Sequence, residues 1–286
     1  MPDDIREVPD EKYWNTFESM WTNLLSYRYL GRRHGSLDKG VEGPETMVLR
    51  HDMRNAAGGI MAAPLCIAAP ESGGMGDDLF VPNPVSASMQ VLDDARDVRA
   101  IEIRREVIKI GRRMGFSRSD IVDADNPARL IARSEGIGVS LADTPPGHVP
   151  VDNPPIDVID SPNLPPLHRV FGASRRPDGQ WTLPQLSKEL ASPDAALHLG
   201  PQHVVLEAAA TELAAALAGT DRVQVEDWHV MFVARAKVGP FRVEGSCGTG
   251  RDKSRIGVRL SMVDEGNGGR IVTTGQAVFR SDGTGV

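Results

Sequence analysis

The chain has 286 residues, of which 40% are hydrophobic and 25% charged, a balance typical of a globular protein with a buried core. Its net charge of −7 excludes the broad basic surface that nucleic acid or an anionic membrane requires. A membrane span needs about 18 apolar residues in a row, and the sequence has no such run. The acidic N-terminus does not resemble a secretory signal, and the two cysteines show no metal-ligand spacing. We therefore expect a cytoplasmic protein that binds neither metal nor nucleic acid.

The first third of the chain is expected to be mostly helical. Residues 11–30 place aromatic and leucine side chains at mostly helical spacing, which predicts an amphipathic helix packed on the body of the protein. A short strand is expected at Glu45–Arg50. Small apolar residues then dominate Ala56–Ala69 and predict a tightly packed helix, in which Pro64 either causes a kink or lies near the start.

The next segment changes from helical to β character. Residues 84–141 contain β-branched, partly alternating stretches separated by charged or glycine turns, which predict strands. Within them, residues 107–117 predict a strand pair that turns at Gly111. Residues 144–166 then hold eight prolines. Because proline removes amide donors and disfavours helix, this segment is expected to be an extended linker.

The second half repeats this plan. An alanine-rich helix is expected from His203 to Ala218, ended by Gly219. Strands are then expected within residues 221–237, 241–250, 254–265 and 268–280.

A repeated motif supports the duplication. The pattern V-D-x-x-N-x-x-R at residues 122–129 recurs at 263–270, and in both places it lies between two expected strands. A similar offset relates Gly111 to Gly250 and the first small-residue helix to the second. The expected units are an N-terminal helical segment (1–35), a first domain (36–143), a proline-rich linker (144–167) and a second domain (168–286).

The second helix carries a family resemblance. Gly200-Pro201-Gln202-His203 opens it, Glu212 follows nine positions after His203, and a strand-rich run fills residues 241–280. This arrangement resembles the hot-dog fold, and in particular its phenylacetate-type and hydroxybenzoyl-CoA-type thioesterases, which carry a G-x-x-H-G-G helix start followed by an acid at that distance. The resemblance implies an α+β fold with two hot-dog domains in tandem. Each would be a long helix packed on a curled antiparallel sheet, and together they would form an intramolecular pseudo-dimer.

Each half keeps a different part of that motif. The first half reads Arg54-Asn55-Ala56-Ala57-Gly58-Gly59, so the two glycines are present, but Ala57 replaces the histidine and Cys66 occupies the acidic position. In the second half, Val204-Val205 stands where the family has two glycines. The resemblance therefore implies one competent site, which combines the glycines of one half with the acid of the other.

At the competent site, the resemblance gives each residue a role. The helix-start amides of Gly58 and Gly59 would stabilise the oxyanion of a thioester under attack. Glu212 would act as nucleophile or as general base on water. His51 and Asn55 would polarise the carbonyl or hold the water.

The second pocket would be degenerate, since it pairs His203 and Val204 with Cys66 and lacks a carboxylate. Structural interpretations stay open beside these roles: Glu212 as a solvent-facing charge, His203 as a helix-start residue with a backbone hydrogen bond, and Cys66 as a small buried hydrophobe. Glu207 precedes Glu212 by five positions, so the two acids cannot face one pocket equally.

Coenzyme A would enter as part of the substrate, and no other cofactor is expected. The basic residues at the corresponding strand turns are the candidates for contacting its phosphates: Arg112, Arg113, Arg251, Lys253 and Arg255. Hot-dog pairs often associate further, so a homodimer of tandem chains is a further expectation of the resemblance.

Three functions remain open. The first is an acyl-CoA thioesterase. The second is a non-catalytic protein that binds acyl-CoA or another ligand, because each half lacks part of the motif. The third is an enoyl-CoA hydratase or dehydratase, which needs an Asp-His pair in one pocket. His51 and Asp52 are adjacent in sequence, but neighbours on a strand face opposite sides.

Overall fold

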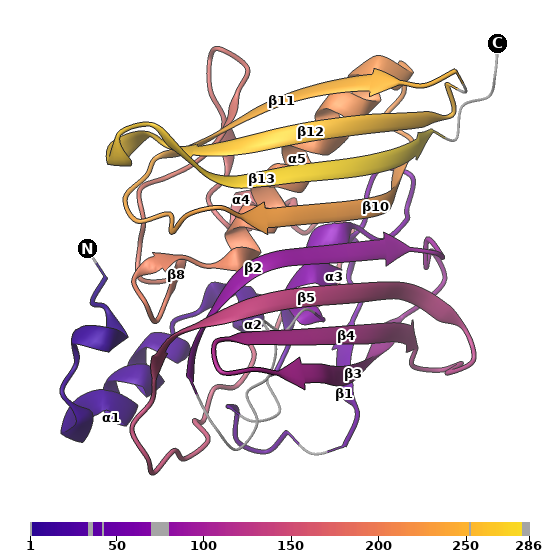
Figure 1. Cartoon of the computed structure of the whole chain (residues 1–286). Coiled ribbons are helices and arrows are strands. Elements are labelled where there is room, and N and C mark those ends of the chain that lie inside the picture. The colour runs from indigo at the N-terminus through magenta and orange to yellow at the C-terminus, as the bar shows by residue number, and fades with distance from the viewer. Residues whose placement is uncertain (1, 34–36, 42, 70–79, 252, 282–286) are drawn as a thin grey trace.

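The computed structural model describes residues 2–33, 37–41, 43–69, 80–251 and 253–281. Within them, the main element is an antiparallel sheet of eleven strands in the order β1-β3-β4-β5-β2-β10-β13-β12-β11-β7-β6 (Figure 1). The chain begins with η1 (Ile5–Glu7), α1 (Asp10–Trp21) and α2 (Leu25–Leu30). Next come β1 (Glu45–Val48), η2 (His51–Met53), α3 (Ala62–Ala68), β2 (Phe80–Val91), β3 (Ala100–Ile110), β4 (Met114–Asp123) and β5 (Leu130–Asp143). The remaining elements are α4 (Leu167–Val170), β6 (Ser174–Arg175), β7 (Trp181–Leu183), β8 (Ala191–Ser192), β9 (Ala196–Leu197), α5 (Leu199–Ala218), β10 (Val223–Phe232), β11 (Phe241–Thr249), β12 (Arg255–Asp264), η3 (Glu265–Asn267) and β13 (Arg270–Ser281).

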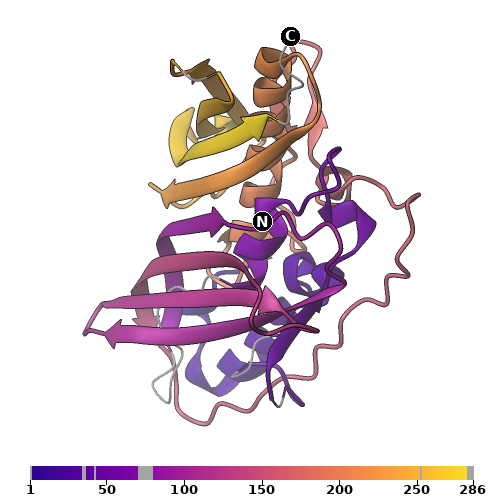
Figure 2. The ribbon, with the colours of Figure 1, turned by 90° about the vertical axis from the view of Figure 1, so that its right-hand side faces the viewer.

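The sheet is continuous because β2 pairs with β10 in its middle, with Gln90 opposite Asp227 and Ser86 opposite Met231. We call this pairing the seam, and the elements from β1 to β5 and from α4 to β13 the first and second halves. The strand order is mirrored about the seam: β2-β5-β4-β3-β1 on one side and β10-β13-β12-β11-β7 on the other. Helices α3 and α5 contact each other and lie on the same side of the sheet (Figure 2).

Helix α5 forms as its composition predicts. The alanine-rich run supplies strong helix formers, and Gly219 ends the helix in the left-handed conformation at φ 70°. It begins at Leu199, four residues earlier than expected, because the side chain of His198 caps it by accepting the N–H of Gly200.

Helix α3 is shorter than expected, since Ala62–Ala68 is helical rather than Ala56–Ala69. The residues before it form a tight turn. Asn55 Oδ1 accepts the N–H groups of Ala57 at 2.9 Å and Gly59 at 3.0 Å, and Gly58 takes a φ of 82°. A side chain that binds nearby amides in this way competes with the helix. The expectation that Gly58 and Gly59 open the helix was therefore wrong.

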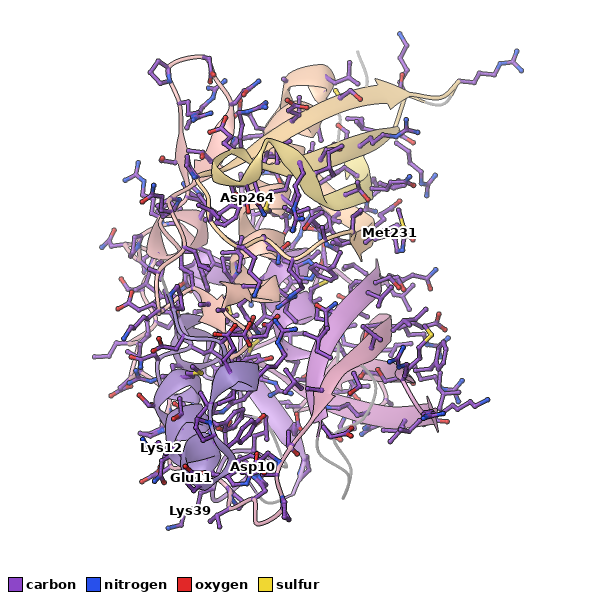
Figure 3. All side chains as sticks on the ribbon, turned by 60° about the vertical axis from the view of Figure 1, so that its left-hand side comes forward. Asp10, Glu11, Lys12, Lys39, Met231 and Asp264 are labelled. Atoms are coloured by element: carbon purple, nitrogen blue, oxygen red, sulfur yellow. The ribbon has the colours of Figure 1, made fainter. Side chains whose placement is uncertain are left out.

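The N-terminal aromatics pack on the body as predicted, although residues 11–30 form two helices rather than one. Tyr13, Phe17 and Trp21 are buried, and the rings of Phe17 and Trp21 stack with centroids 5.6 Å apart. The charged residues at the start of α1 lie on its outer side (Figure 3).

The two copies of the repeated motif occupy equivalent places, because β4 ends at Asp123 and β12 at Asp264. Their side chains hold different loops. Asp123 accepts the N–H of Asp125 at 2.9 Å. Asp264, labelled in Figure 3, is fully buried and accepts three N–H groups from residues 237–239. The predicted strand pair that turns at Gly111 is the β3–β4 hairpin.

The proline-rich residues 144–166, all described, contain neither helix nor strand beyond one isolated bridge from Val151 to Asp38. They run as an extended segment beside the first half (Figure 2), as the prolines predict. Ile156 N–H bonds Arg28 O at 2.9 Å and holds the segment against α2. The domain boundaries set within and beside this linker stay predictions.

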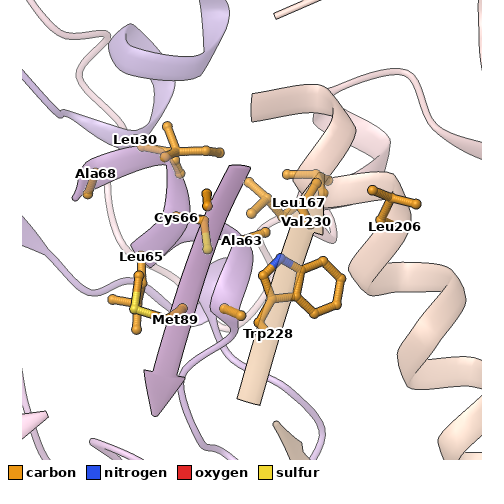
Figure 4. Close-up of a cluster of buried hydrophobic side chains, with 14 of the residues drawn as sticks. Leu30, Ala63, Leu65, Cys66, Ala68, Met89, Leu167, Leu206, Trp228 and Val230 are labelled. Carbon is orange, nitrogen blue, oxygen red and sulfur yellow. The ribbon is translucent and has the colours of Figure 1, made fainter. Parts of the chain in front are cut away.

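The core crosses the seam without interruption. Figure 4 shows Cys66 of α3 and Met89 of β2 in one cluster with Leu206 of α5 and Trp228 of β10. Because these side chains come from both halves, the halves share one hydrophobic core rather than two. Among the helices of the described residues, none combines the length and hydropathy that crossing a bilayer demands.

Candidate functional site

A buried carboxylate joins the two halves. Glu207, in the N-terminal half of α5, is 2% exposed and reaches across to the start of α3. Its Oε1 accepts the N–H of Ala62 at 2.7 Å, and its Oε2 accepts the N–H of Ala63 at 2.6 Å. The first N–H groups of a helix have no partner within the helix, so an acid from the second half completes a helix of the first.

Burial governs the titration of this acid. Loss of solvation raises the pKa of Glu207 to about 7, and the hydrogen bonds from Ala63 and Ala62 oppose that rise only in part. A carboxyl with this pKa exchanges a proton near neutral pH, as general acid–base chemistry requires. Each oxygen also keeps a lone pair beyond the one that its amide uses.

Cys66 lies one turn along α3 and is fully buried. Burial first, and the charge of Glu207 second, raise the pKa of its thiol well above the ordinary value. Since the thiolate is the nucleophilic form, a neutral thiol in this position is unsuited to attack. The geometry fits the interpretation of Cys66 as a small buried hydrophobe.

An amide pair fixes the turn that precedes α3. Asn55 Nδ2 donates to Gln224 Oε1 at 2.7 Å, and Gln224 Nε2 donates to Ile60 O at 3.0 Å. Because Gln224 lies on β10, this pair also crosses between the halves. A Cβ on Gly59 would stand 1.9 Å from Gln224 Oε1, so only glycine fits there. This turn, which contains Asn55, Gly58 and Gly59, therefore positions the start of α3. The N–H groups of both glycines already donate to Asn55 within the turn.

The structure does not bring Glu212 to those glycines. Its carboxylate accepts Trp181 Nε1–H at 2.9 Å and forms an ion pair with Arg175 at 2.7 Å, and its side chain is 38% exposed. Five helical residues correspond to a rotation of about 140° about the axis. With Glu207 turned toward α3, Glu212 must therefore face the outer edge of its own half.

Neither a protein-family model nor a curated protein sequence matches this chain. Solved structures do. The tesB protein of Mycobacterium avium subspecies paratuberculosis is similar with a TM-score of 0.59 at 14% identity, over 89% of this chain and 97% of that one. Acyl-CoA thioesterase II TesB2 from Mycobacterium marinum is similar with a TM-score of 0.58 at 12% identity, over 89% and 97%. A protein from Alicyclobacillus acidocaldarius described as having the hot dog fold is similar with a TM-score of 0.53 at 9% identity, over 91% and 98%. The chain has the hot-dog fold.

The hot-dog fold expected from the sequence is thus confirmed, and the geometry places the remaining candidate residues. His51 lies outside the sheet, at the surface. Its Nδ1 contacts both carboxylate oxygens of Asp160 at 3.0 Å, whereas Asp52 turns inward to Tyr29 and Arg50. As expected, His51 and Asp52 do not form a pair. The structure brings His51 to the linker, not to Glu207.

The residues of the second expected pocket lie in the hot-dog core. His203 and Val204 are fully buried, and His203 Nδ1 accepts the indole N–H of Trp228 at 3.1 Å. Burial lowers the pKa of His203 to about 3, so the ring is neutral at physiological pH. Cys66 of α3, at the position where the family resemblance expects an acid, supplies no carboxylate to this pocket.

The basic residues form no single cluster. Arg112 and Arg113 lie in the β3–β4 turn, and Arg251, Lys253 and Arg255 in or beside the β11–β12 turn. Because neighbouring strands are antiparallel throughout, these two turns lie at opposite ends of the sheet (Figure 1). Arg255 pairs with Glu226 at 2.9 Å. Contacts of these residues with coenzyme A stay a prediction.

Glu207 has no role in the site expected from the sequence, because the family spacing points to Glu212. A signal was present in the helix itself. Glu207 shares one helical face with His203, Ala210 and Ala214, all of which are buried. An acid on an otherwise apolar stripe indicates a buried charge with a specific partner.

Proposed function

We propose that this chain is a tandem of two hot-dog domains that hydrolyses acyl thioesters between its two halves, with Glu207 as the general base. The observation that carries the proposal is the contact of the buried Glu207 carboxylate with the Ala62 and Ala63 amides of the opposite half. It reproduces the arrangement that the family resemblance implies, an acid from one half facing helix-start amides of the other, with different residues in both positions.

The tandem arrangement is supported by the sheet and by the helices. The strand order is mirrored about the seam, and the duplicated motif ends β4 and β12 alike. In this proposal β2 and β10 are equivalent strands of the two domains, and α3 and α5 are their central helices.

The proposed chemistry is the addition of water to a thioester carbonyl. Glu207, ionised above its pKa of about 7, takes a proton from water as the water oxygen bonds to the carbonyl carbon. The carbonyl oxygen becomes an oxyanion, which nearby N–H groups would stabilise. The C–S bond then breaks, and the proton held by Glu207 passes to the departing thiolate. Coenzyme A is the proposed leaving thiol, and it is present only as part of the substrate. The proposal also includes assembly of the chain as a homodimer and a location in the cytoplasm.

The test compares two acids on one helix. Glu207→Gln keeps the size and one acceptor oxygen but cannot take a proton, so acyl-CoA hydrolysis should fall by about 100-fold or more. Glu212→Gln, the matched control, should keep nearly all of the activity. In the wild type, kcat/KM should rise about ten-fold between pH 6 and pH 8, because that interval spans the pKa of Glu207. Free thiol released from a series of acyl-CoA substrates gives the rate. Equal activity of Glu207→Gln and the wild type would exclude this role.

A specific observation favours a second function, a non-catalytic acyl-CoA-binding protein. Both oxygens of Glu207 already bind amides, and the side chain is almost completely buried, as in a purely structural helix cap. Binding of acyl-CoA without release of thiol, in both wild type and Glu207→Gln, would support that function. The hydratase alternative has no such support: the His–Asp pair found among the described residues, His51 and Asp160, is about half exposed at the surface. Loss of enoyl absorbance with crotonyl-CoA would revive it.

A further inference from the structure

The structure fixes which ring nitrogen of a buried histidine carries the hydrogen. His203 lies on α5, one turn before Glu207, and is fully buried. Its Nδ1 lies 3.1 Å from the indole nitrogen of Trp228. An indole nitrogen can only donate, so Nδ1 must be the acceptor, and the single ring hydrogen of a neutral imidazole is then on Nε2. Because burial keeps the ring neutral, Nε2–H is a donor that carries no charge.

That donor has no hydrogen-bond partner among the described residues, although the atom is buried. Polar groups beside it are satisfied. Gln202 donates to Leu197 O at 2.8 Å and accepts from Thr273 Oγ1, and His198 Nδ1 contacts Ser26 Oγ at 2.9 Å. Buried donors are almost always paired in folded proteins, so an exception indicates a ligand or a role.

We propose that His203 Nε2–H donates a hydrogen bond to the carbonyl oxygen of a bound acyl group. This inference rests on the proposed function, since it assigns a second residue to the same site. Positions four apart in a helix share a face, and the two Cα atoms lie about 6 Å apart along the axis. A substrate could therefore contact His203 and Glu207 together.

The surroundings of the ring select an uncharged acceptor. Trp228 and Phe232 line the imidazole from β10, with the Phe232 ring edge-on at 5.8 Å between centroids. In such apolar surroundings a carboxylate or phosphate would lose its hydration without gaining a counter-charge. A thioester carbonyl is uncharged, so it loses little hydration energy on entering this site and gains a hydrogen bond from a fixed donor. Trp228 is a positioning residue here, since its indole holds both the tautomer and the orientation of the ring.

The test separates the carbonyl from the rest of the ligand and requires no turnover. Two stable analogues of one chain length are compared: a ketone, in which CH₂ replaces the thioester sulfur and the carbonyl remains, and an S-alkyl-CoA thioether, which has no carbonyl. The wild type should bind the ketone about ten-fold more tightly, the worth of one hydrogen bond. His203→Asn keeps an acceptor for Trp228 near Nδ1 but is too short to place an N–H at the position of Nε2, so it should lose that preference while binding the thioether unchanged.

Proton NMR on the wild type provides a measurement that does not depend on how any variant folds. The ring Nε2–H resonance of His203 should move downfield when the ketone binds and not when the thioether binds. Equal affinity of His203→Asn and the wild type for the ketone, equal losses for both analogues, or an unmoved resonance would each overturn the proposal. So would failure of both analogues to bind. A chain that shows the ketone preference but hydrolyses no acyl-CoA would refute the hydrolase proposal and leave the role of His203 in place.

Discussion

The two ends of α5 lie in different environments, although one unbroken helix connects them. Its first turns are buried against both halves, and Glu207 there bonds to the Ala62 and Ala63 amides of the other half. Its last turns are partly exposed, and Glu212 there bonds to Trp181 and Arg175 of its own half. Two glutamates of one helix therefore make different contacts, one between the halves and one within the second half. What differs between them is the face of the helix on which each acid lies: Glu207 faces α3, and Glu212 faces the outer strands of its own half.

The difference in burial also explains the raised pKa of Glu207. Desolvation disfavours a charge that water cannot reach, and Glu207 is almost completely buried. An ion pair at the surface gains little, because water and salt screen it. The proposed general base therefore lies in the N-terminal half of α5.

The largest expected effect is a pH-dependent stability that depends on Glu207. Its pKa rises from 4.5 to about 7 on folding, so between these values the native state binds more protons than the unfolded state. The free energy of unfolding contributed by this group is therefore full below about pH 4.5 and is lost as pH rises through about 7, a change of about 3 kcal/mol. Urea unfolding of wild type and Glu207→Gln from pH 4.5 to 8 should show it as a difference between the two. Buried His198 and His203 act with the opposite sign but equally in both proteins, so they cancel.

Parallel curves for the two proteins across that range would show that Glu207 titrates as an exposed acid does. The contrast between the two ends of α5 would then lose its physical basis. Glu212→Gln, measured in the same way, is the matched control for the removal of one carboxylate from α5.

The next effect tests the turn that brings α3 to the seam. In Gly59→Ala, the new Cβ would stand 1.9 Å from Gln224 Oε1, and Gln224 can yield only by giving up its bonds to Asn55 and Ile60. We expect a loss of about 2–3 kcal/mol in the free energy of unfolding. Gly58→Ala meets no atom within 4 Å, but φ is 82° there, so it should cost about 1–2 kcal/mol by backbone strain alone.

Chemical denaturation of the two variants ranks them. A greater loss for Gly58→Ala than for Gly59→Ala would contradict the close approach of the two halves at this turn. Gly59→Ala should also lower hydrolysis, because it displaces the amides that hold Glu207, whereas Gly58→Ala should affect it less.

Much of the fold followed from the sequence because its signals are local or repeated. The alanine run and Gly219 define α5, the prolines define the extended linker, and the repeated V-D-x-x-N-x-x-R pattern ends β4 and β12. The hot-dog fold itself came from the family resemblance. The prediction of where α3 begins was wrong, because the Asn55 side chain binds the Ala57 and Gly59 amides in competition with the helix. The position of that side chain depends in turn on its hydrogen bond to Gln224, 169 positions away.

The candidate site residues stay predictions, but the structure shows which acid of α5 contacts the first half. The expectation that an acid of the second half meets amides of the first agrees with the Glu207 contact, yet a family spacing counted from His203 selected Glu212. Spacing along a helix fixes which residues share a face, but not which face turns to the partner. That choice is made by packing across the seam, where Cys66, Met89 and Trp228 meet, and no local pattern encodes it.

The smallest expected effect completes the comparison at the outer end of α5. Glu212→Ala removes the ion pair with Arg175 and the acceptor for Trp181 Nε1–H. Since this carboxylate is partly exposed, water replaces both partners, and the free energy of unfolding should fall by about 1 kcal/mol or less. Arg175→Ala should lower the free energy of unfolding by no more than Glu212→Ala does. The loss in the double variant should equal the sum of the two single losses to within the coupling energy of one surface ion pair. Thermal unfolding of the three variants, with acyl-CoA hydrolysis measured beside it, checks both parts. A loss of kcat in Glu212→Ala without a loss of stability would support the catalytic role that the family resemblance implies for this residue, because a purely structural residue would lower both quantities together.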